Sequence, residues 1–460
     1  MDPAQPKQRW QREIRGLMRI AGPLLVNFIA VAAIHFADAV MSGRIGPETM
    51  AAVAVGGSLW MVGFTACLGI VMSVSPIVSR RFGAGEFSTI GRYTRQGLIL
   101  GQLMALIQLA LVQLFIEPVL VALGISEEFR ELTVGYVKAI SWGLPAIAGF
   151  LVFRFTTEGI GFTRPIMYIS LLSVLTNVAG NYIFMFGKFG VPAMGAVGCG
   201  ISSAITMWVM LIAIAGYMYR HPRYRPLEIF HMMTRVRLPL IREMLALGVP
   251  IAITMLAETG LFSAVSVLMG TRGATVAASH QIALNVTSTI FMIPLALSGA
   301  ITVRVGHALG AKDAAAARYS GWIGIGIAGT FMFCSAIAVL IFREAVVGIY
   351  SPDAAVQAIA INLLFMAAIF QVADGIQISA AGALRGYKDT RVPMVINTFA
   401  FWVLAFPLAY MATITYRSPP QYIWGAFVLG LTVSAIMLSL RYRHISGREY
   451  LAALAGEPAR

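Results

Sequence analysis

Long runs without a charged residue are the feature that most constrains how this chain can fold. A helix that crosses a membrane needs about 20 largely apolar residues. Ten stretches of at least 18 residues contain no Asp, Glu, Lys or Arg, and they cover residues 20–37, 49–79, 96–116, 165–187, 189–219, 273–303, 319–342, 354–373, 392–416 and 418–440. Two further spans qualify if one charge is allowed, at about 131–153 with Lys138 and at 244–271 with Glu258. The sequence therefore predicts an all-α integral membrane protein with 12 transmembrane helices.

The charge balance agrees with a membrane protein. Only 12% of the 460 residues are charged, whereas soluble domains contain about 25%. The net charge of +14 would suggest nucleic-acid binding in a soluble protein, but here the basic residues lie in short clusters between apolar runs. We therefore expect membrane lipid as a partner and no nucleic acid. Separately, we expect a monomer that binds small molecules.

The distribution of basic residues predicts the orientation. An even number of spans places both termini on the same side of the membrane. The N-terminus, the C-terminus and the loops on their side carry 27 of the 34 Lys and Arg residues. Positive charge is retained in the cytoplasm, so both termini are predicted to be cytoplasmic. The first apolar run follows a basic lead-in and lacks a small-residue cleavage site, so we expect it to remain in the protein.

Motifs for enzymatic chemistry or ATP use are absent from the sequence. Cys67, Cys199 and Cys334 lie far apart in apolar runs, which gives neither a disulfide framework nor metal-ligand spacing. No phosphate-binding loop and no nucleophile–base motif occurs. We therefore expect that the protein is not an enzyme and has no cofactor, and that any transport across the membrane is driven by an ion gradient and not by ATP.

The chain resembles itself at an offset of about 227 residues. Pro23 matches Pro250, and Gly83-Ala-Gly-Glu86 matches Gly310-Ala-Lys-Asp313. Further matches follow in the same order, which is hard to obtain by chance. Because each repeat holds six spans, the sequence predicts two pseudo-symmetric six-helix bundles, residues 1–230 and 231–460, with a substrate cleft between them.

Three carboxylates interrupt the predicted spans, and a charge inside a membrane is costly enough to make each a functional candidate. They are Asp38, Glu258 and Asp374. The alternative is a structural hydrogen-bonding role, or, for Asp38, a position near the membrane interface.

Helical spacing places further candidate residues together on two helix faces. Phe370 and Gln377 share a face with Asp374, at i−4 and i+3. Asn177 and Asn181 are one turn apart and present two carbonyl oxygens side by side. Such oxygens suit Na⁺ or a protonatable network, but Asn also joins membrane helices by hydrogen bonds. Both interpretations remain open from spacing alone.

Several motifs of the chain resemble those of the multidrug and toxic compound extrusion (MATE) transporters, and the NorM-like bacterial branch is the most similar. The resemblance extends from about residue 10 to 445. The motifs that carry it are Phe-Ala-Asp-Ala-Val-Met-Ser-Gly around Asp38, Pro76-Ile-Val-Ser before Gly83-Ala-Gly85, Glu158-Gly before Thr163-Arg-Pro165, Gly306-His-Ala-Leu-Gly310 and Leu384-Arg-Gly-Tyr-Lys-Asp389.

This resemblance implies an antiporter in the bacterial cytoplasmic (inner) membrane that exports lipophilic cationic drugs and toxic compounds in exchange for Na⁺ or H⁺. It assigns an N-terminal ion and proton network to Asp38, Asn177, Asn181 and Ser203. It also assigns a C-terminal cation site, a candidate Na⁺ site, to Glu258 and Asp374. Phe370 stands where some relatives have Tyr, so one candidate oxygen ligand is missing while a ring for cation–π contact is kept.

Two other functions fit a similar fold. A lipid-linked saccharide flippase should present a cationic cavity, whereas the sequence places no Lys or Arg mid-span and predicts that all buried charge is negative. An exporter of one specific metabolite is a milder alternative that the sequence does not separate from a multidrug exporter.

Overall fold

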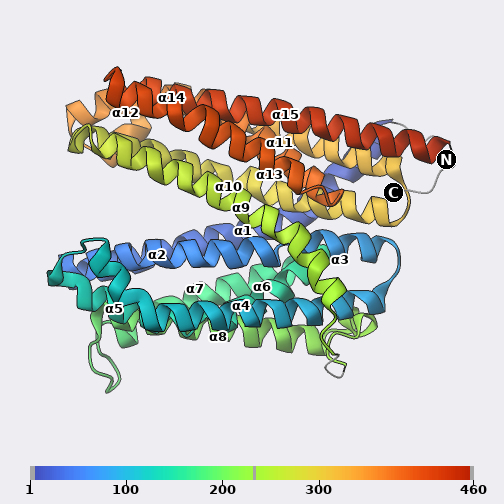
Figure 1. The fold of residues 1–460 in the computed structure, drawn as a ribbon, viewed down its shortest axis with the longest axis horizontal. Coiled ribbons are helices and arrows are strands. Elements are labelled where there is room, and N and C mark those ends of the chain that lie inside the picture. Colours follow the sequence, from blue (N-terminus) through green and yellow to red (C-terminus); the bar gives the residue numbers. More distant parts are fainter. Residues whose placement is uncertain (1–5, 232–234, 456–460) are drawn as a thin grey trace. The chain divides into compact units, whose positions relative to one another are not determined.

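The computed structural model describes residues 6–231 and 235–455, and almost all of them are helical (Figure 1). The α-helices are α1 (Pro6–Ile45), α2 (Pro47–Val71), α3 (Val74–Gly83), α4 (Phe87–Ala122), α5 (Glu127–Ser141), α6 (Leu144–Gly159), α7 (Arg164–Phe184), α8 (Gly195–Arg220), α9 (Leu238–Gly270), α10 (Ala274–Gly310), α11 (Ala314–Tyr350), α12 (Ala354–Gly386), α13 (Arg391–Thr398), α14 (Phe406–Tyr410) and α15 (Pro420–Leu454). A 3₁₀ segment, η1 (Pro222–Leu227), follows α8, and two π-helical segments, η2 (Phe399–Ala405) and η3 (Met411–Thr415), flank α14.

Within the described residues, 11 helical segments are long and apolar enough to cross a membrane. The pair α5 and α6, bent by 46° at its break, makes up to 12. The prediction of an all-α, multi-span membrane protein is confirmed. One predicted span, residues 49–79, is divided into α2 and α3. The break follows from Pro76, which has no N–H to continue the helical hydrogen bonds, and from Ser73, whose hydroxyl donates to the Ile70 carbonyl at 2.7 Å.

The chain packs into two units, one of residues 22–252 and the other of residues 1–21 with 253–460. Helices α1 and α9 each contribute to both units, and each is divided within three residues of its proline, Pro23 or Pro250. The division into two six-helix lobes, residues 1–230 and 231–460, remains a prediction.

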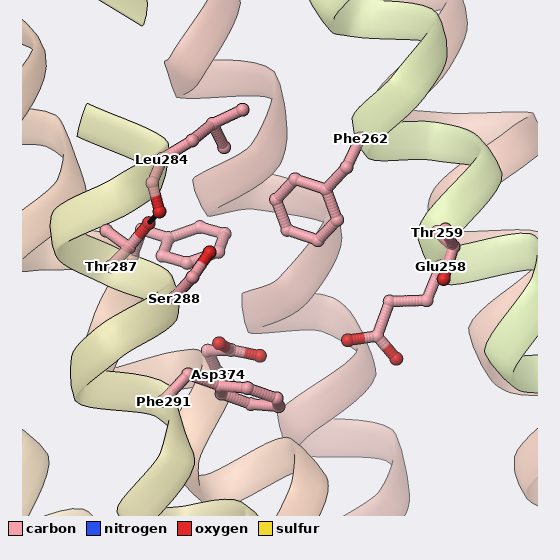
Figure 2. A pocket seen from close by; sticks show the side chains of 9 residues that line it. Glu258, Thr259, Phe262, Leu284, Thr287, Ser288, Phe291 and Asp374 are labelled. Atoms are coloured by element: carbon pink, nitrogen blue, oxygen red, sulfur yellow. Dashed lines mark hydrogen bonds between the residues drawn. The ribbon is translucent and has the colours of Figure 1, made fainter. Parts of the chain in front are cut away.

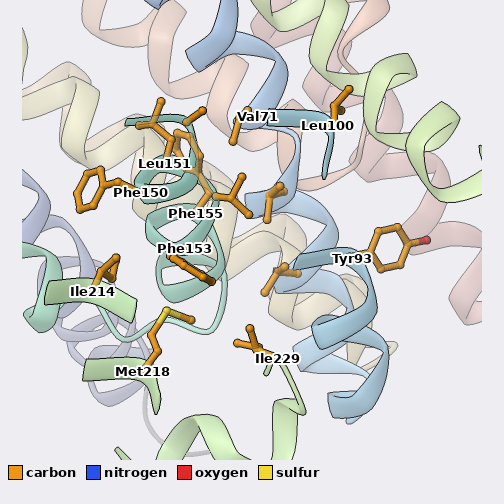
Figure 3. Close-up of a cluster of buried hydrophobic side chains, with 14 of the residues drawn as sticks. Val71, Tyr93, Leu100, Phe150, Leu151, Phe153, Phe155, Ile214, Met218 and Ile229 are labelled. Atoms are coloured by element: carbon orange, nitrogen blue, oxygen red, sulfur yellow. The ribbon is translucent and has the colours of Figure 1, made fainter. Parts of the chain in front are cut away.

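Helix α6 forms the centre of the unit of residues 22–252. Its first ten residues are apolar on all sides, as expected for a helix that is covered all round, and almost every residue in it is buried. Figure 3 shows its side chains, among them Phe150 and Phe153, packed against Val71, Leu100 and Ile214 from neighbouring helices. This core includes residues of α7 and α8, the helices that carry Asn177, Asn181 and Ser203.

Helix α12 has the corresponding place in the other unit. It packs against α10, α11 and α15, and its second half is almost entirely buried. Beside its first half lies a cluster of fully buried rings, of which Trp424, Phe427 and Phe370 are the largest members. The C-terminal candidate residues lie next to this aromatic cluster.

The helix contacts repeat at the offset seen in the sequence. Gly159 of α6 lies so close to α3 that an added Cβ would come within 2.7 Å of Val78 Cβ and 3.1 Å of the Ser75 carbonyl. Gly386 of α12 has the same relation to α10, at 2.8 Å from Val305 Cβ and 3.1 Å from the Thr302 carbonyl. All three pairs are separated by 227 residues, so the repeat is confirmed as a repeat of structure.

Candidate functional site

Asp38 and Asn181 form the centre of a polar network in the unit of residues 22–252. Asn181 Nδ2, on α7, donates a 2.6 Å hydrogen bond to Asp38 Oδ1 on α1, and it also lies 3.3 Å from Asn177 Oδ1. Asn177 Nδ2 lies 3.5 Å from the Ser203 hydroxyl on α8, and Ser202 donates to the Asn177 carbonyl at 2.9 Å. The structure thus brings together the predicted residues Asp38, Asn177, Asn181 and Ser203.

A second hydrogen bond holds α1 and α7 in the same register. Ser170 on α7 donates to Asn27 Oδ1 on α1 at 2.7 Å. Ser170 follows Asn27 by 143 residues, and Asn181 follows Asp38 by the same number. The two links lie about three helical turns apart. A slip of one helix along the other would therefore break both bonds, and the Asp38–Asn181 geometry is fixed.

The second candidate site is a cavity of about 240 Å³ in the unit that contains residues 253–460. Helix α9 contributes Glu258, Thr259 and Phe262, and helix α12 contributes Phe370 and Asp374. The remaining lining residues come from α10 and are Leu284, Thr287, Ser288 and Phe291. The cavity therefore combines two carboxylates with three phenyl rings.

The carboxylates of Glu258 and Asp374 are directed into the same space (Figure 2). The ring of Phe262 lies on one side of them and that of Phe291 on the other. Asp374 is 5% exposed, and its Oδ1 has no hydrogen-bond partner among the described residues. The two acids interact electrostatically with each other. A cation or a proton held between them would relieve both the repulsion and the unmet hydrogen bond.

Phe370 forms a fixed part of the cavity wall. It is 2% exposed and packs edge-on against Phe262, with ring centroids 6.1 Å apart. On another side it packs edge-on against Trp424 at 5.7 Å. The structure thus brings the predicted residues Glu258, Phe370 and Asp374 together, and their role as a site remains a prediction. No group of three or more His, Cys, Asp or Glu in the described chain is placed to hold a metal ion.

Sequence reasoning missed the wall that α10 contributes. Leu284, Thr287 and Phe291 are spaced as one helical face, but they lie in the charge-free run 273–303, whose polar residues occur on several faces and do not mark the one that looks into a cavity. Phe262 is one turn from Glu258, so the i+4 rule could have found it. Gln377 was expected to share the face of Asp374; it does not line the cavity, and neither of its amide atoms has a hydrogen-bond partner among the described residues.

The prediction that all buried charge is negative was wrong. Arg154 on α6 and Arg385 on α12 are each only 9% exposed. The Arg154 guanidinium lies 5.5 Å from the ring centroids of Phe28 and Phe155 and interacts with Glu158. Arg385 donates to the Ser298 hydroxyl at 2.6 Å and acts electrostatically on Glu258. Arg154 directly follows the predicted span 131–153 and Arg385 lies in the last turn of α12, positions from which a long side chain can bend back into the protein.

The chain matches one protein family twice. The family described as MatE matches residues 23–183 and again residues 250–411. The two matches begin at Pro23 and Pro250, which is the 227-residue offset found within the sequence.

Curated relatives are similar over nearly the whole chain. The multidrug resistance protein PmpM of Pseudomonas aeruginosa is 38% identical over 446 residues, which cover 95% of this chain and 94% of that protein. A probable multidrug resistance protein NorM of Xanthomonas campestris pv. campestris is 39% identical over 440 residues, with 96% of each chain covered.

Solved structures share the fold at low sequence identity. The crystal structure of the eukaryotic MATE transporter AtDTX14 matches with a TM-score of 0.85 at 18% identity and covers 96% of this chain and 99% of its own. An outward-facing multidrug resistance transporter of the MATE family matches with a TM-score of 0.86 at 19% identity and covers 95% and 96%.

Proposed function

Because the chain belongs to the multidrug and toxic compound extrusion (MATE) family, we propose that it exports lipophilic cationic compounds in exchange for Na⁺ or H⁺. The observation that carries the proposal is the cavity in which Glu258 and Asp374 face each other between phenyl rings. Phenyl walls accept apolar bodies of many shapes, and the two acids attract positive charge without strict geometry.

Exchange follows from competition for this negative centre. Carboxylates that are withdrawn from water are stabilised by neutralisation, either by a proton or by a cation. Once a coupling ion has neutralised the pair, the attraction for a cationic substrate is lost, and the reverse also holds. The positive charge of Arg385, which does not line the cavity, acts on Glu258 and stabilises its carboxylate form.

The lining of the cavity argues against a saccharide flippase. None of the nine described lining residues is Lys or Arg, whereas a pyrophosphate-linked substrate requires basic groups. Arg154 and Arg385 are buried, but neither lines this cavity. Export of a single metabolite would use the same competition and differs only in the range of substrates.

Transport into proteoliposomes tests the function. Na⁺ and H⁺ gradients are imposed separately while uptake of ethidium, a lipophilic cation, is followed by fluorescence. We expect uptake under at least one gradient, inhibition by other lipophilic cations, and no inhibition by strongly anionic dyes. Equal transport of an anionic dye, or uptake without any gradient, contradicts the proposal.

We further propose that the protein lies in the bacterial inner membrane as a monomer with both termini in the cytoplasm. The 27 basic residues on the side of the termini support this orientation. In a variant without native cysteines, a single cysteine at Arg44 or Arg343 should react with an impermeant maleimide from outside the cell. Labelling that requires access from the cytoplasm overturns the orientation.

A further inference from the structure

His280 joins three helices beside the acidic cavity. Trp424 of α15 donates its indole Nε1–H to His280 Nδ1 on α10, at 3.1 Å. The other ring nitrogen, Nε2, lies 3.1 Å from the Ser266 hydroxyl on α9. His280 is 2% exposed and Trp424 is fully buried. His280 is thus the middle member of a chain of hydrogen bonds that joins α9, α10 and α15.

The partners of His280 fix its tautomer. An indole N–H can only donate, so Nδ1 must be the unprotonated acceptor. The Ser266 hydroxyl has one proton, and it donates this proton to the Phe262 carbonyl at 2.8 Å. The Ser266 oxygen is therefore left to accept from Nε2–H. Each polar atom of the neutral imidazole has a partner, and the ring cannot turn without breaking both bonds.

Both hydrogen-bond partners of His280 contact residues that line the cavity. Trp424 packs edge-on against Phe370, with centroids 5.7 Å apart and planes at 65°. Ser266 holds the backbone of Phe262, whose ring is edge-on to Phe370 at 81°. Phe262 and Phe370 line the cavity, whereas His280 does not.

We propose that His280 is a positioning residue which sets the angles of Phe262 and Phe370 and thereby determines which organic cations the cavity accepts. The inference rests on the proposed function. A cation–π contact requires the charge over the ring face within about 6 Å of its centroid. Rotation of these rings therefore alters the fit of a flat aromatic cation differently from that of a compact, near-spherical one.

Transport selectivity in proteoliposomes tests the assignment. His280→Leu removes both hydrogen bonds, and Trp424→Phe keeps a ring but removes the donor. For each variant we expect the ratio of the KM values for ethidium and tetraethylammonium to change by about tenfold, the lower end of what a misfit of one methylene produces in a hydrophobic pocket. The Vmax and the response to the ion gradient should stay near the wild type.

The double variant separates positioning from general packing. If His280 acts through Trp424, the double variant should shift the KM ratio no further than one single variant does. Trp322→Phe on α11, where Trp322 contacts Tyr442 instead, is the matched control and should leave the ratio unchanged. An unchanged ratio, an equal loss of Vmax for both cations, or additive effects overturn the inference.

A measurement without transport tests the positioning role of His280 separately from the proposed function. Protein grown with 5-fluorotryptophan gives one ¹⁹F signal for each tryptophan. The signal that is absent from the Trp424→Phe variant belongs to Trp424. His280→Leu should move this signal, and no change overturns the positioning role. Wild-type protein that transports neither cation contradicts the proposed function instead.

Discussion

Asp38 and Asp374 are both buried carboxylates, but their surroundings differ. Asp38 accepts a 2.6 Å hydrogen bond from Asn181 within a network of amides and hydroxyls. Asp374 faces Glu258 across an aromatic cavity, and its Oδ1 has no hydrogen-bond partner among the described residues. Asp38 is bonded to an amide in a narrow network, in which Asn181 Oδ1 has no partner among the described residues, and such a network suits a proton. Asp374 lacks an amide partner within the described chain and faces a second acid in a cavity, which suits a cation. The two centres therefore predict different responses to substitution.

This difference arises on a duplicated backbone. At the 227-residue offset, Asp374 corresponds to Ile147, Asp38 to Val265 and Glu258 to Val31. Gly159 and Gly386, in contrast, make the same close approach to a neighbouring helix. Duplication kept the positions that allow helices to pack, while the polar side chains differ between the repeats. Symmetry of the fold therefore does not imply symmetry of the chemistry.

The largest expected effect comes from removing either acid of the cavity. Asp374→Asn and Glu258→Gln should each abolish gradient-driven uptake of ethidium, because one remaining acid no longer forms the doubly negative centre. Insertion should be kept, since a neutral amide costs less in the membrane than a carboxylate. Uptake in proteoliposomes with matched protein content measures the effect. Glu117→Gln, at an exposed position of α4, is the control, and wild-type rates in both acid variants would disprove the mechanism.

Loss of the Asp38 network should impair coupling less completely. In Asn181→Leu, Asp38 loses its 2.6 Å hydrogen bond. Such a bond to a charged group contributes about 1.5–3 kcal/mol. We therefore expect the rate of H⁺-driven uptake to fall at least about tenfold. Asp38→Asn should give a similar loss. Thr176→Ala, on the exposed side of α7, serves as control. If Asn181→Leu reduced Na⁺-driven and H⁺-driven uptake alike, the network would not be specific for protons.

The candidate sites show which features can be predicted from sequence. A charge in an apolar run stands out, so Asp38, Glu258 and Asp374 were found. The α10 wall was not, because Thr287 and Phe291 lie among residues of similar polarity. Arg154 was missed because it directly follows the run 131–153, and only the fold shows whether a side chain at such a border turns inward. Spans and periodicity are local properties, whereas burial at a helix end depends on the neighbouring helices.

The repeated glycines offer a test of backbone equivalence. Gly159→Ala and Gly386→Ala should each destabilise the protein by about 1–3 kcal/mol, because the new methyl group would lie too close to Val78 or Val305. Thermal unfolding in detergent measures the loss. Gly216→Ala and Gly326→Ala, at helix positions with open space beside the Cβ, are the controls and should not destabilise. A strong loss in only one repeat would contradict equivalent packing.

A smaller effect is expected from restoring an oxygen in the cavity. Phe370→Tyr adds a hydroxyl to a ring that lines the site beside Asp374. One added ligand of about 1 kcal/mol should lower the Na⁺ concentration for half-maximal uptake by about fivefold. Uptake is measured against Na⁺ at constant pH. Phe365→Tyr, at an exposed position on the same helix, should have no effect, and a Phe370→Tyr variant that responds as the wild type shows that Na⁺ does not bind beside this ring.

The smallest expected effect concerns turns that the two repeats share. Two residues after the ends of α3 and α10 the chain adopts a left-handed conformation, at Gly85 with φ 74° and at Lys312 with φ 60°. In both turns the amide of the following residue, Glu86 or Asp313, bonds back to a carbonyl five residues earlier. A lysine in this conformation costs about 1 kcal/mol relative to glycine.

Lys312→Gly should therefore stabilise the protein by about 0.5–1 kcal/mol, and Gly85→Lys should destabilise it by a similar amount. The melting temperature in detergent, measured with several independent preparations, reports both changes. Ala311→Gly is the matched control: its φ is −73°, which any residue adopts, so the added freedom of glycine should lower stability. If Lys312→Gly were also destabilising, the lysine side chain would contribute more than the strain it causes, and the two turns would be equivalent in geometry but not in energy.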